Sequence, residues 1–195
     1  MHLEEALSSK MDIKAFIFDM DGLLFDSERI VQRSWEMAGD ELGIPHMGDV
    51  IYHTLGMNRT GRNEYFRKYI REDFPFEEFG KLTRDNFWKI VDKEGLPLKK
   101  GAKELLAYGK SQGYKMAVAT SSSREYAMGN LIRAGIDPYF DSVICGDMVK
   151  KAKPDPEIYQ KACESLGIQP EYCMAFEDAP GGILSAHQAG MHVIM

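Results

Sequence analysis

The strongest hydrophobic pattern in the chain is a short apolar run that ends in two carboxylates. Residues 15–18 read Ala-Phe-Ile-Phe, and Asp19, Asp21 and Gly22 follow within four positions. A run of this length bounded by a glycine predicts a buried strand. Because ligands of open α/β sheets bind beyond the carboxyl ends of the strands, the two acids stand where chemistry is expected.

Residues 29–94 change from a strand pattern to a helical one. Their apolar residues recur at helical spacing in three stretches, which predicts three helices and an all-helical insert. Gly95 and Pro97 close the insert, and a first linker is expected around residues 27–29. The three apolar faces consist of Ile30, Val31, Trp35, Ala38 and Leu42; of Tyr65, Phe66, Tyr69 and Ile70; and of Phe79, Leu82, Phe87, Ile90 and Val91.

From Gly101 onward, predicted helices and strands alternate. This alternation predicts a parallel sheet covered by helices on both faces. The predicted helices cover 102–112, 124–134, 156–167 and 181–189, and the predicted strands cover 114–120, 142–145, 173–176 and 192–195. We therefore expect an α/β core domain over residues 11–27 and 96–195, and a helical domain over residues 28–95.

Composition and charge narrow the possible partners. The 195 residues, 44% of them hydrophobic, are enough for one well-packed core and an insert. The net charge of −6 and the absence of a basic block argue against nucleic acids and acidic membranes as partners. Cys145, Cys163 and Cys173 are odd in number and lack Cys-x-x-Cys spacing, so neither a disulfide framework nor a zinc site is indicated. The cysteines fit a reducing cytosol, and the chain has neither a signal-peptide pattern nor a long apolar run, so we expect a cytoplasmic protein. Its charge indicates a small-molecule partner, and we expect a monomer.

Polar clusters follow four successive strands of the predicted sheet. In a parallel sheet the carboxyl ends of the strands meet at one edge, so these clusters should converge there. They are Asp19 with Asp21, Thr120 with Ser121 and Ser122, Lys153, and Glu177 with Asp178.

Acids, an ammonium group and hydroxyls at one edge suit metal-assisted attack on a phosphate. A carboxylate repels a phosphoryl charge by about 4 kcal/mol at ~4 Å when the effective dielectric constant is near 20. Attack by Asp19 therefore needs compensating cations, which Lys153 and a divalent ion can supply. Since the clusters offer oxygen ligands and neither His nor Cys, they favour Mg²⁺ over zinc.

Four stretches of the chain resemble the haloacid dehalogenase-like (HAD) phosphohydrolases, in the branch that includes β-phosphoglucomutase and many small phosphatases. They occur in the family's order and span nearly the whole chain. The stretches are residues 19–28 (Asp-Met-Asp-Gly-Leu-Leu-Phe-Asp-Ser-Glu), 119–122 (Ala-Thr-Ser-Ser), 153–159 (Lys-Pro-Asp-Pro-Glu-Ile-Tyr) and 176–182 (Phe-Glu-Asp-Ala-Pro-Gly-Gly). The resemblance implies a Rossmann-like core with a helical cap.

The resemblance also implies a role for each matched residue. Asp19 would be the nucleophile that forms an aspartyl-phosphate. Asp21 would first protonate the leaving oxygen and later activate water. Thr120 and the amide of Ser121 would hold phosphoryl oxygens, and Lys153 would offset negative charge.

For the metal and the substrate, the resemblance implies a second set of contacts. Mg²⁺ would be bound by Asp19, the backbone carbonyl of Asp21, Glu177 and Asp178. The helical insert would be a mobile cap that closes over the site and excludes bulk water. Candidates for contact with the rest of a small phosphorylated metabolite are Arg59, Arg62 and Ser122.

Structural interpretations of single motifs stay open at this stage. Thr120 to Ser122 are typical of loop and helix N-cap positions, and Glu177 with Asp178 could simply favour the positive end of a following helix. Lys153 could be an ordinary exposed lysine.

The last residues, 192–195, resemble a strand of the sheet, yet relatives usually continue beyond it, so we expect this strand to be weakly protected.

Three functions fit the motifs. The first is a Mg²⁺-dependent phosphatase for a sugar phosphate or nucleotide, and the second is a phosphomutase of the β-phosphoglucomutase type. Sugar-phosphate mutases of this branch commonly carry a histidine ten residues after the second Asp, where this chain has Val31. That difference favours the phosphatase. The third function, a silent phosphate-binding protein, is disfavoured because the catalytic acids and Lys153 are all present.

Overall fold

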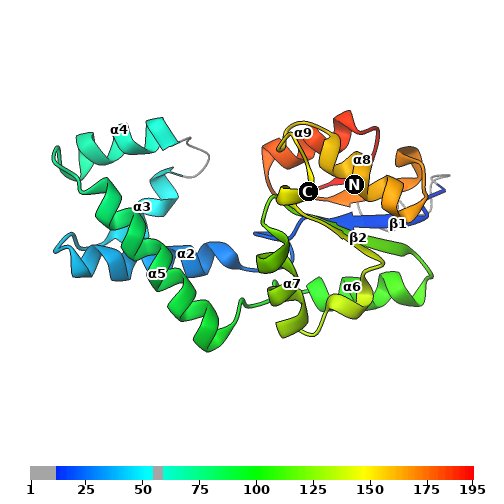
Figure 1. Ribbon diagram of the computed structural model, residues 1–195, viewed down its shortest axis with the longest axis horizontal. Helices are drawn as coiled ribbons and strands as arrows, with labels where there is room; N and C mark the ends of the chain where they lie inside the picture. Colours follow the sequence, from blue (N-terminus) through cyan, green and yellow to red (C-terminus); the bar gives the residue numbers. More distant parts are fainter. Residues whose placement is uncertain (1–11, 55–58) are drawn as a thin grey trace. The chain divides into compact units, whose positions relative to one another are not determined.

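A parallel sheet organises the larger part of the computed structural model, which describes residues 12–54 and 59–195, except the side chain of Arg59. Within these ranges the sheet has five strands in the order β3-β2-β1-β4-β5, all parallel to their neighbours (Figure 1). Their bounds are β1 Ala15–Phe18, β2 Lys115–Ala119, β3 Ser142–Ile144, β4 Cys173–Phe176 and β5 His192–Ile194. The prediction of an α/β fold with a parallel sheet is confirmed.

Helices cover both faces of this sheet. Helices α8 and α9 lie on one face and α6 and α7 on the other (Figure 1). Their bounds are α6 Ala102–Ser111, α7 Arg124–Arg133, α8 Glu157–Leu166 and α9 Pro180–Gln188. Short 3₁₀ turns add η1 Asp137–Tyr139, η2 Gly146–Met148 and η3 Pro170–Tyr172.

The two faces of β1 pack differently because its side chains alternate. Ala15 and Ile17 join a core of small and aliphatic residues that also includes Tyr159 of α8. Phe16 and Phe18 point to the opposite face, where the ring of Phe18 stacks on that of Phe176 with 4.8 Å between centroids. Because all four residues of β1 are buried, the strand reads as one continuous apolar run.

The segment Ser27–Leu96 forms a second compact unit, separate from the unit made of residues up to Asp26 and Pro97–Met195. Its helices are α2 Ser27–Glu41, α3 Met47–Thr54, α4 Arg59–Tyr69 and α5 Phe76–Glu94. Aromatic rings dominate its core, and the Trp35 ring meets both Phe66 and Phe79 edge-on at 5.6 Å. No helix in the described ranges combines the length and the apolar character needed to span a bilayer.

The prediction of three helices in this insert was wrong, because α3 is a further helix there. With eight residues, α3 is too short for helical periodicity to stand out. Gly48 lies inside it, and its amide donates to Glu36 Oε2 of α2 at 2.7 Å. A Cβ at position 48 would lie 2.9 Å from that oxygen, so the glycine that weakens the helix pattern is what permits the close contact with α2.

Candidate active site

The first motif places Asp19 at the carboxyl end of β1. The Asp19 amide extends the strand ladder by donating to the carbonyl of Phe176 at 3.0 Å, and the residue is only 8% exposed. The chain then turns at Gly22, whose φ is +84°. This backbone conformation favours glycine, and a Cβ on Gly22 would overlap Asp178 Oδ2 in the position that this carboxylate occupies.

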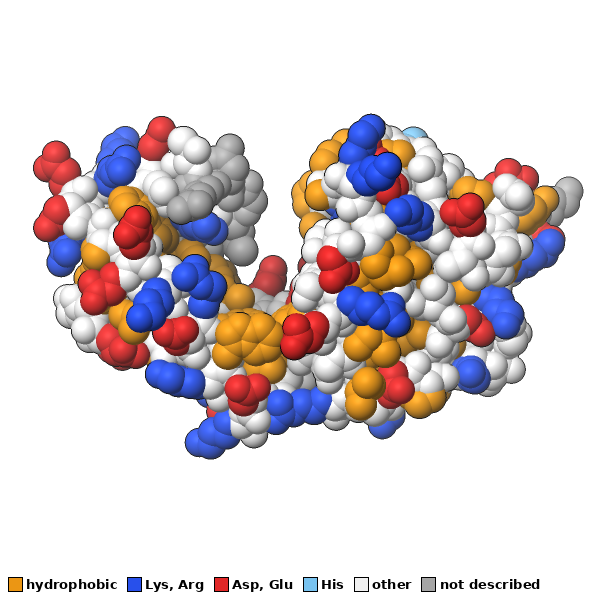
Figure 2. Space-filling model, viewed as in Figure 1, with side chains coloured by type: hydrophobic (Ala, Val, Ile, Leu, Met, Phe, Trp, Pro, Cys, Tyr) orange, Lys and Arg blue, Asp and Glu red, His pale blue; other side chains and the backbone are white. Residues whose placement is uncertain are grey.

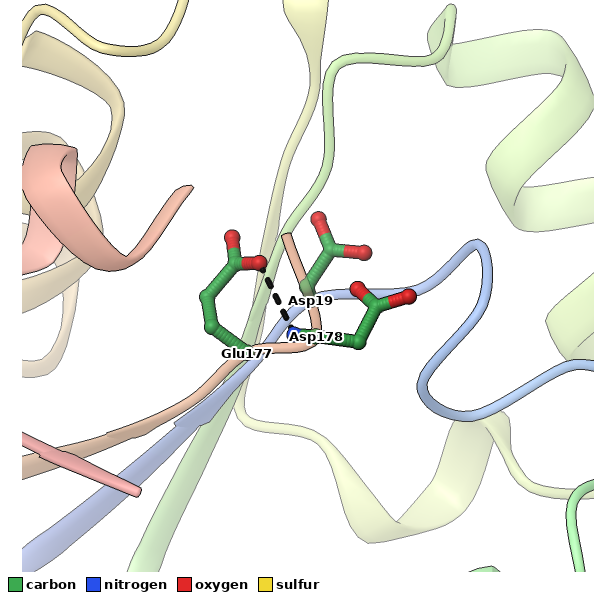
Figure 3. Close-up of side chains that lie close together, drawn as sticks. All are labelled: Asp19, Glu177 and Asp178. Carbon is green, nitrogen blue, oxygen red and sulfur yellow. Dashed lines mark hydrogen bonds between the residues drawn. The ribbon is translucent and has the colours of Figure 1, made fainter. Parts of the chain in front are cut away.

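Three carboxylates meet at this point. One oxygen from each of Asp19, Glu177 and Asp178 lies within 4.8 Å of the others, and the side chains extend from the ends of β1 and β4 (Figure 3). Glu177 is 1% exposed, whereas Asp178 faces solvent. A Cβ on Gly182 would overlap Glu177 Oε1, so this glycine of α9 makes room for the buried carboxylate.

Lys153 joins two of these acids. Its Nζ lies 2.5 Å from Asp19 Oδ1 and 2.6 Å from Glu177 Oε1, and it also donates to the carbonyl of Ala119 at 3.0 Å. The Lys153 side chain is 10% exposed, which excludes the interpretation of an ordinary surface lysine. Two buried carboxylates on one ammonium group leave the cluster with an excess of negative charge.

Tyr159 of α8 completes this arrangement and was not predicted as a site residue. Its hydroxyl donates to Glu177 Oε1 at 2.6 Å and lies 3.3 Å from Lys153 Nζ. Burial and the adjacent Glu177 raise the pKa of Tyr159, so the phenol stays protonated and acts as a donor. The available signal was a tyrosine on the core face of the predicted helix, whose buried hydroxyl must find a partner.

Burial also governs the protonation of Asp19. Desolvation raises the pKa of Asp19 to about 7, the neighbouring Lys153 opposes this shift, and the negative charge of Glu177 adds to it. In the absence of another cation, Asp19 is therefore partly protonated near neutral pH. A positive charge placed among these acids would favour the ionised form that a nucleophile needs.

The carboxylate of Asp21 lies outside the three-acid cluster. Ser122 Oγ donates to its Oδ2 at 2.8 Å, and the hydroxyl of Tyr126 donates to its Oδ1 at 3.1 Å. Ser122, expected as a substrate contact, therefore has its hydroxyl engaged with Asp21. Tyr126 is a second residue that sequence reasoning missed.

The structure also shows what the hydroxyl-bearing residues after β2, Thr120 to Ser122, contact. Thr120 is 1% exposed, and its Oγ1 accepts from the amide of Ser122 at 3.1 Å, while Ser121 is exposed. The residue that caps α7 is Ser123, whose side chain accepts from the amide of Tyr126 at 3.4 Å. The N-cap function thus belongs to Ser123 and not to Thr120, Ser121 or Ser122.

Comparison with known proteins identifies the family. The family model for haloacid dehalogenase-like hydrolases matches residues 13–190, a span that contains all four motifs. The chain is a haloacid dehalogenase-like hydrolase. The predictions of this family and of an enzyme are confirmed.

Relatives of the hydrolase align over nearly all of this chain and over most of their own length. It is 33% identical to a protein named "Phosphorylated carbohydrates phosphatase" from Thermotoga maritima, over 93% of this chain and 84% of that one. A HAD family hydrolase from Deinococcus radiodurans R1, solved with bound phosphate and sodium, is 25% identical, has a TM-score of 0.81, and aligns over 94% of this chain and 80% of its own. A β-phosphoglucomutase from Clostridium difficile is 25% identical with a TM-score of 0.65, over 93% and 83% of the two chains.

The arginines predicted to contact substrate belong to the helical unit of the hydrolase. Arg59 is the first residue of α4, but its side chain and the preceding residues 55–58 lie outside the described part of the structure. Arg62 lies 5.9 Å from the Trp35 ring and borders a cavity of about 680 Å³ within this unit. The cavity is lined by Val31, Trp35, Arg62, Asn63, Phe66, Phe76, Glu77, Phe79, Gly80, Thr83 and Arg84.

The surface of the hydrolase carries charges of both signs. On the face shown in Figure 2, basic and acidic side chains are interspersed over each unit. This distribution agrees with a net charge of only −6 on 195 residues. It offers no sign of an extended polyanion-binding surface on that face.

Proposed function

We propose that this hydrolase is a Mg²⁺-dependent phosphatase that acts on a small phosphomonoester, with phosphorylated sugars as the preferred class. The observation that carries the proposal is the Lys153 ammonium group between two buried carboxylates, Asp19 and Glu177, at the end of the sheet. The name of the Thermotoga maritima relative supports carbohydrate phosphates as substrates. The bound phosphate in the Deinococcus radiodurans structure supports an anion site on the same fold.

The donor set fits a hard divalent ion. The cluster offers carboxylate oxygens, and neither His nor Cys belongs to it among the described residues. We propose Asp19, Asp178, Glu177 and the backbone carbonyl of Asp21 as ligands. When bound, Mg²⁺ would neutralise the carboxylates and attract the phosphoryl group to them.

Glu177 is the weakest of these candidates. Its Oε1 already accepts from Lys153 and Tyr159, and its Oε2 accepts from the amides of Asp178 and Ala179 at 3.2 and 3.4 Å. A carboxylate with both oxygens engaged has few lone pairs left for an ion. We therefore expect Asp19 and Asp178 to contribute most to metal affinity.

The reaction would proceed in two displacements at phosphorus. An oxygen of Asp19 forms a bond to phosphorus while the ester P–O bond breaks, and the leaving oxygen takes a proton from Asp21. Water then attacks the phosphorus of the aspartyl-phosphate and gives its proton to Asp21. The bond to Asp19 breaks, and inorganic phosphate is released.

Thr120 and Ser121 would hold the phosphoryl oxygens during both steps. Thr120 Oγ1 already accepts from the Ser122 amide, so its own proton is available to donate. Donors aimed at the charge that develops in the transition state are typically worth ~10²–10³-fold in rate.

In this proposal the domain of residues 28–95 acts as a cap, and Arg62 and Arg59 contact the part of the substrate that is not transferred.

A screen of phosphate release tests the proposal. Purified protein would be incubated with Mg²⁺ and a panel of sugar phosphates and nucleoside monophosphates, and each reaction would be repeated with excess chelator. We expect release from at least one sugar phosphate, loss of release with chelator, and no release by Asp19→Asn in either condition. Equal release by wild type and Asp19→Asn would exclude Asp19 as the nucleophile, and release that survives chelation would exclude the metal.

Phosphomutase activity is the second candidate. The similarity to the Clostridium difficile β-phosphoglucomutase favours it. Against it, Val31 offers no group for proton transfer at the position where mutases of this branch carry histidine, and the described Val31 instead borders the cavity of the helical unit. Conversion of glucose 1-phosphate to glucose 6-phosphate faster than phosphate is released would favour the mutase.

A further inference from the structure

Both oxygens of the Asp21 carboxylate accept a hydrogen bond from a hydroxyl group. Ser122 Oγ donates to one oxygen at 2.8 Å and the Tyr126 hydroxyl donates to the other at 3.1 Å. Both donors are more than 100 residues distant in sequence, so these bonds tie the loop after β1 to the beginning of α7. With both oxygens held, the carboxylate cannot rotate about its Cβ–Cγ bond unless both hydrogen bonds break.

We infer that Tyr126 is a positioning residue for the hydrolase reaction, because its hydroxyl and that of Ser122 together fix the orientation of the Asp21 carboxylate. The inference rests on the proposed role of Asp21 as the acid and base. A proton donor must be aimed at the leaving oxygen before the P–O bond breaks, and an error of about 1 Å can cost ~10²-fold in rate. A freely rotating carboxylate would reach that geometry only part of the time.

The first turn of α7 is built to hold Tyr126 in place. The Tyr126 amide donates to the N-cap side chain of Ser123 at 3.4 Å, and the Asn130 side chain donates to the Tyr126 carbonyl at 2.9 Å. Asn130 is itself 6% exposed. Tyr126 is half-buried, and burial together with the adjacent Asp21 raises the pKa of its phenol, so its hydroxyl acts as a hydrogen-bond donor to the Asp21 carboxylate.

Leaving-group dependence separates this role from a structural one. The leaving oxygen of an alkyl phosphate needs a proton. The leaving group of p-nitrophenyl phosphate is a stable phenolate and does not need one. The value of kcat/KM reports the steps up to release of the leaving group, that is, the step in which Asp21 acts as an acid. Misplacing Asp21 should therefore lower kcat/KM for the alkyl substrate far more than for the aryl one.

The experiment compares Tyr126→Phe with a matched control, Tyr108→Phe, which removes the same hydroxyl from an exposed tyrosine of α6. Both would be assayed with p-nitrophenyl phosphate and with the best sugar phosphate from the screen. For Tyr126→Phe we expect kcat/KM on the sugar phosphate to fall by about tenfold, a part of the ~10²–10⁴-fold that general acid catalysis typically supplies. With the aryl phosphate, kcat/KM of Tyr126→Phe should change by less than about twofold. The kcat/KM of the control, Tyr108→Phe, should not change with either substrate.

Two further variants test whether Tyr126 acts through Asp21. Ser122→Ala should show the same dependence on the leaving group, and Tyr126→Phe should have no additional effect in an Asp21→Asn background, because the group it positions is gone. Equal losses with both substrates, no loss at all, or additive losses in Asp21→Asn would overturn the inference. If wild type releases phosphate from neither substrate, the proposed function itself fails, which is a different outcome from an active enzyme that is indifferent to Tyr126.

Discussion

Buried charge distinguishes the two units of the chain, because both buried carboxylates of the described residues, Asp19 and Glu177, lie in the α/β unit. In the α/β unit, buried Asp19 and Glu177 come from different strands and are joined through Lys153. In the helical unit, buried Ser34 and Thr54 donate to carbonyls of their own helices. A polar group that is satisfied within its own helix has a structural role, whereas buried charges gathered from distant segments are costly and point to function.

One face of the sheet also differs from the core of the helical unit, although the opposite face carries the rings of Phe16, Phe18 and Phe176. The face of the sheet beneath α8 and α9 packs alanines and single aliphatic side chains against one another, and the charged site lies at its edge. The helical unit relies on a cluster of rings around Phe66. We therefore expect substitutions at the end of the sheet to affect chemistry first, and substitutions in the ring cluster to affect the stability of the helical unit first.

The largest effect is expected from Lys153→Met. Loss of the ammonium group leaves Asp19 and Glu177 buried without their shared cation, which typically costs about 3–5 kcal/mol of stability when a buried pair is broken. Activity should fall by ~10²–10³-fold, because the same group offsets charge on the nucleophile and the phosphate. The measurements are urea unfolding and phosphate release.

Lys151→Met serves as the control for this variant, since the Lys151 side chain is 73% exposed and pairs with Asp155 at the surface. It should change stability by less than about 1 kcal/mol. If the two methionine variants behave alike, Lys153 is not the cation of the site, and the contrast between the units loses its main support.

A large but different effect is expected from Phe66→Ala. The ring is 2% exposed and contacts Trp35, Phe74 and Phe79. Its removal should cost about 3–5 kcal/mol and act mainly on the helical unit. Amide exchange should accelerate in α2 and α5 while β1 and β4 stay protected.

For comparison, Tyr69→Ala removes a ring that is 60% exposed and should leave exchange in both units nearly unchanged. Faster exchange throughout the sheet in Phe66→Ala would show that the two units unfold together. The separation drawn between their cores would then be wrong.

A smaller effect on the free energy of unfolding is expected from a change of pH in the absence of metal. Burial raises the pKa of Asp19 from 3.8 to about 7, so between these values the folded protein binds more protons than the unfolded chain. The contribution of Asp19 to the free energy of unfolding should therefore fall, by a few kcal/mol at most, as the pH rises from about 4 to about 7. Asp19→Asn has no such group and serves as the reference.

Urea unfolding in chelator at about pH 5 and about pH 8 measures this effect. The stability of wild type relative to Asp19→Asn should be lower at the higher pH, and added Mg²⁺ should reduce the difference. A wild type that gains stability relative to Asp19→Asn as the pH rises would contradict the raised pKa.

Much of the fold follows directly from local patterns. The strand before Asp19 and the alternation after Gly101 were predictable because a buried strand is continuously apolar and surface helices are amphipathic. Asp19, Lys153, Glu177 and Asp178 were predicted together because parallel strands bring their carboxyl ends to one edge.

Other features could not be predicted because they depend on tertiary contacts. Helix α3 is too short to show a period and contains Gly48, which is needed for its contact with Glu36. Tyr126 and Tyr159 resemble ordinary amphipathic helix residues in the sequence. Their roles depend on where their hydroxyl groups end in space, next to Asp21 and Glu177.

Detection of the phosphorylated enzyme tests the central claim most directly. Protein, Mg²⁺ and a substrate identified by the screen would be mixed, quenched in acid within milliseconds to seconds, digested and analysed by mass spectrometry. We predict a phosphoryl group on the peptide that contains Asp19, present transiently in wild type and absent in Asp19→Asn and in chelator. Turnover by wild type with no phosphorylated peptide at any time, or with the phosphoryl group on another residue, would contradict the assignment of Asp19 as the nucleophile.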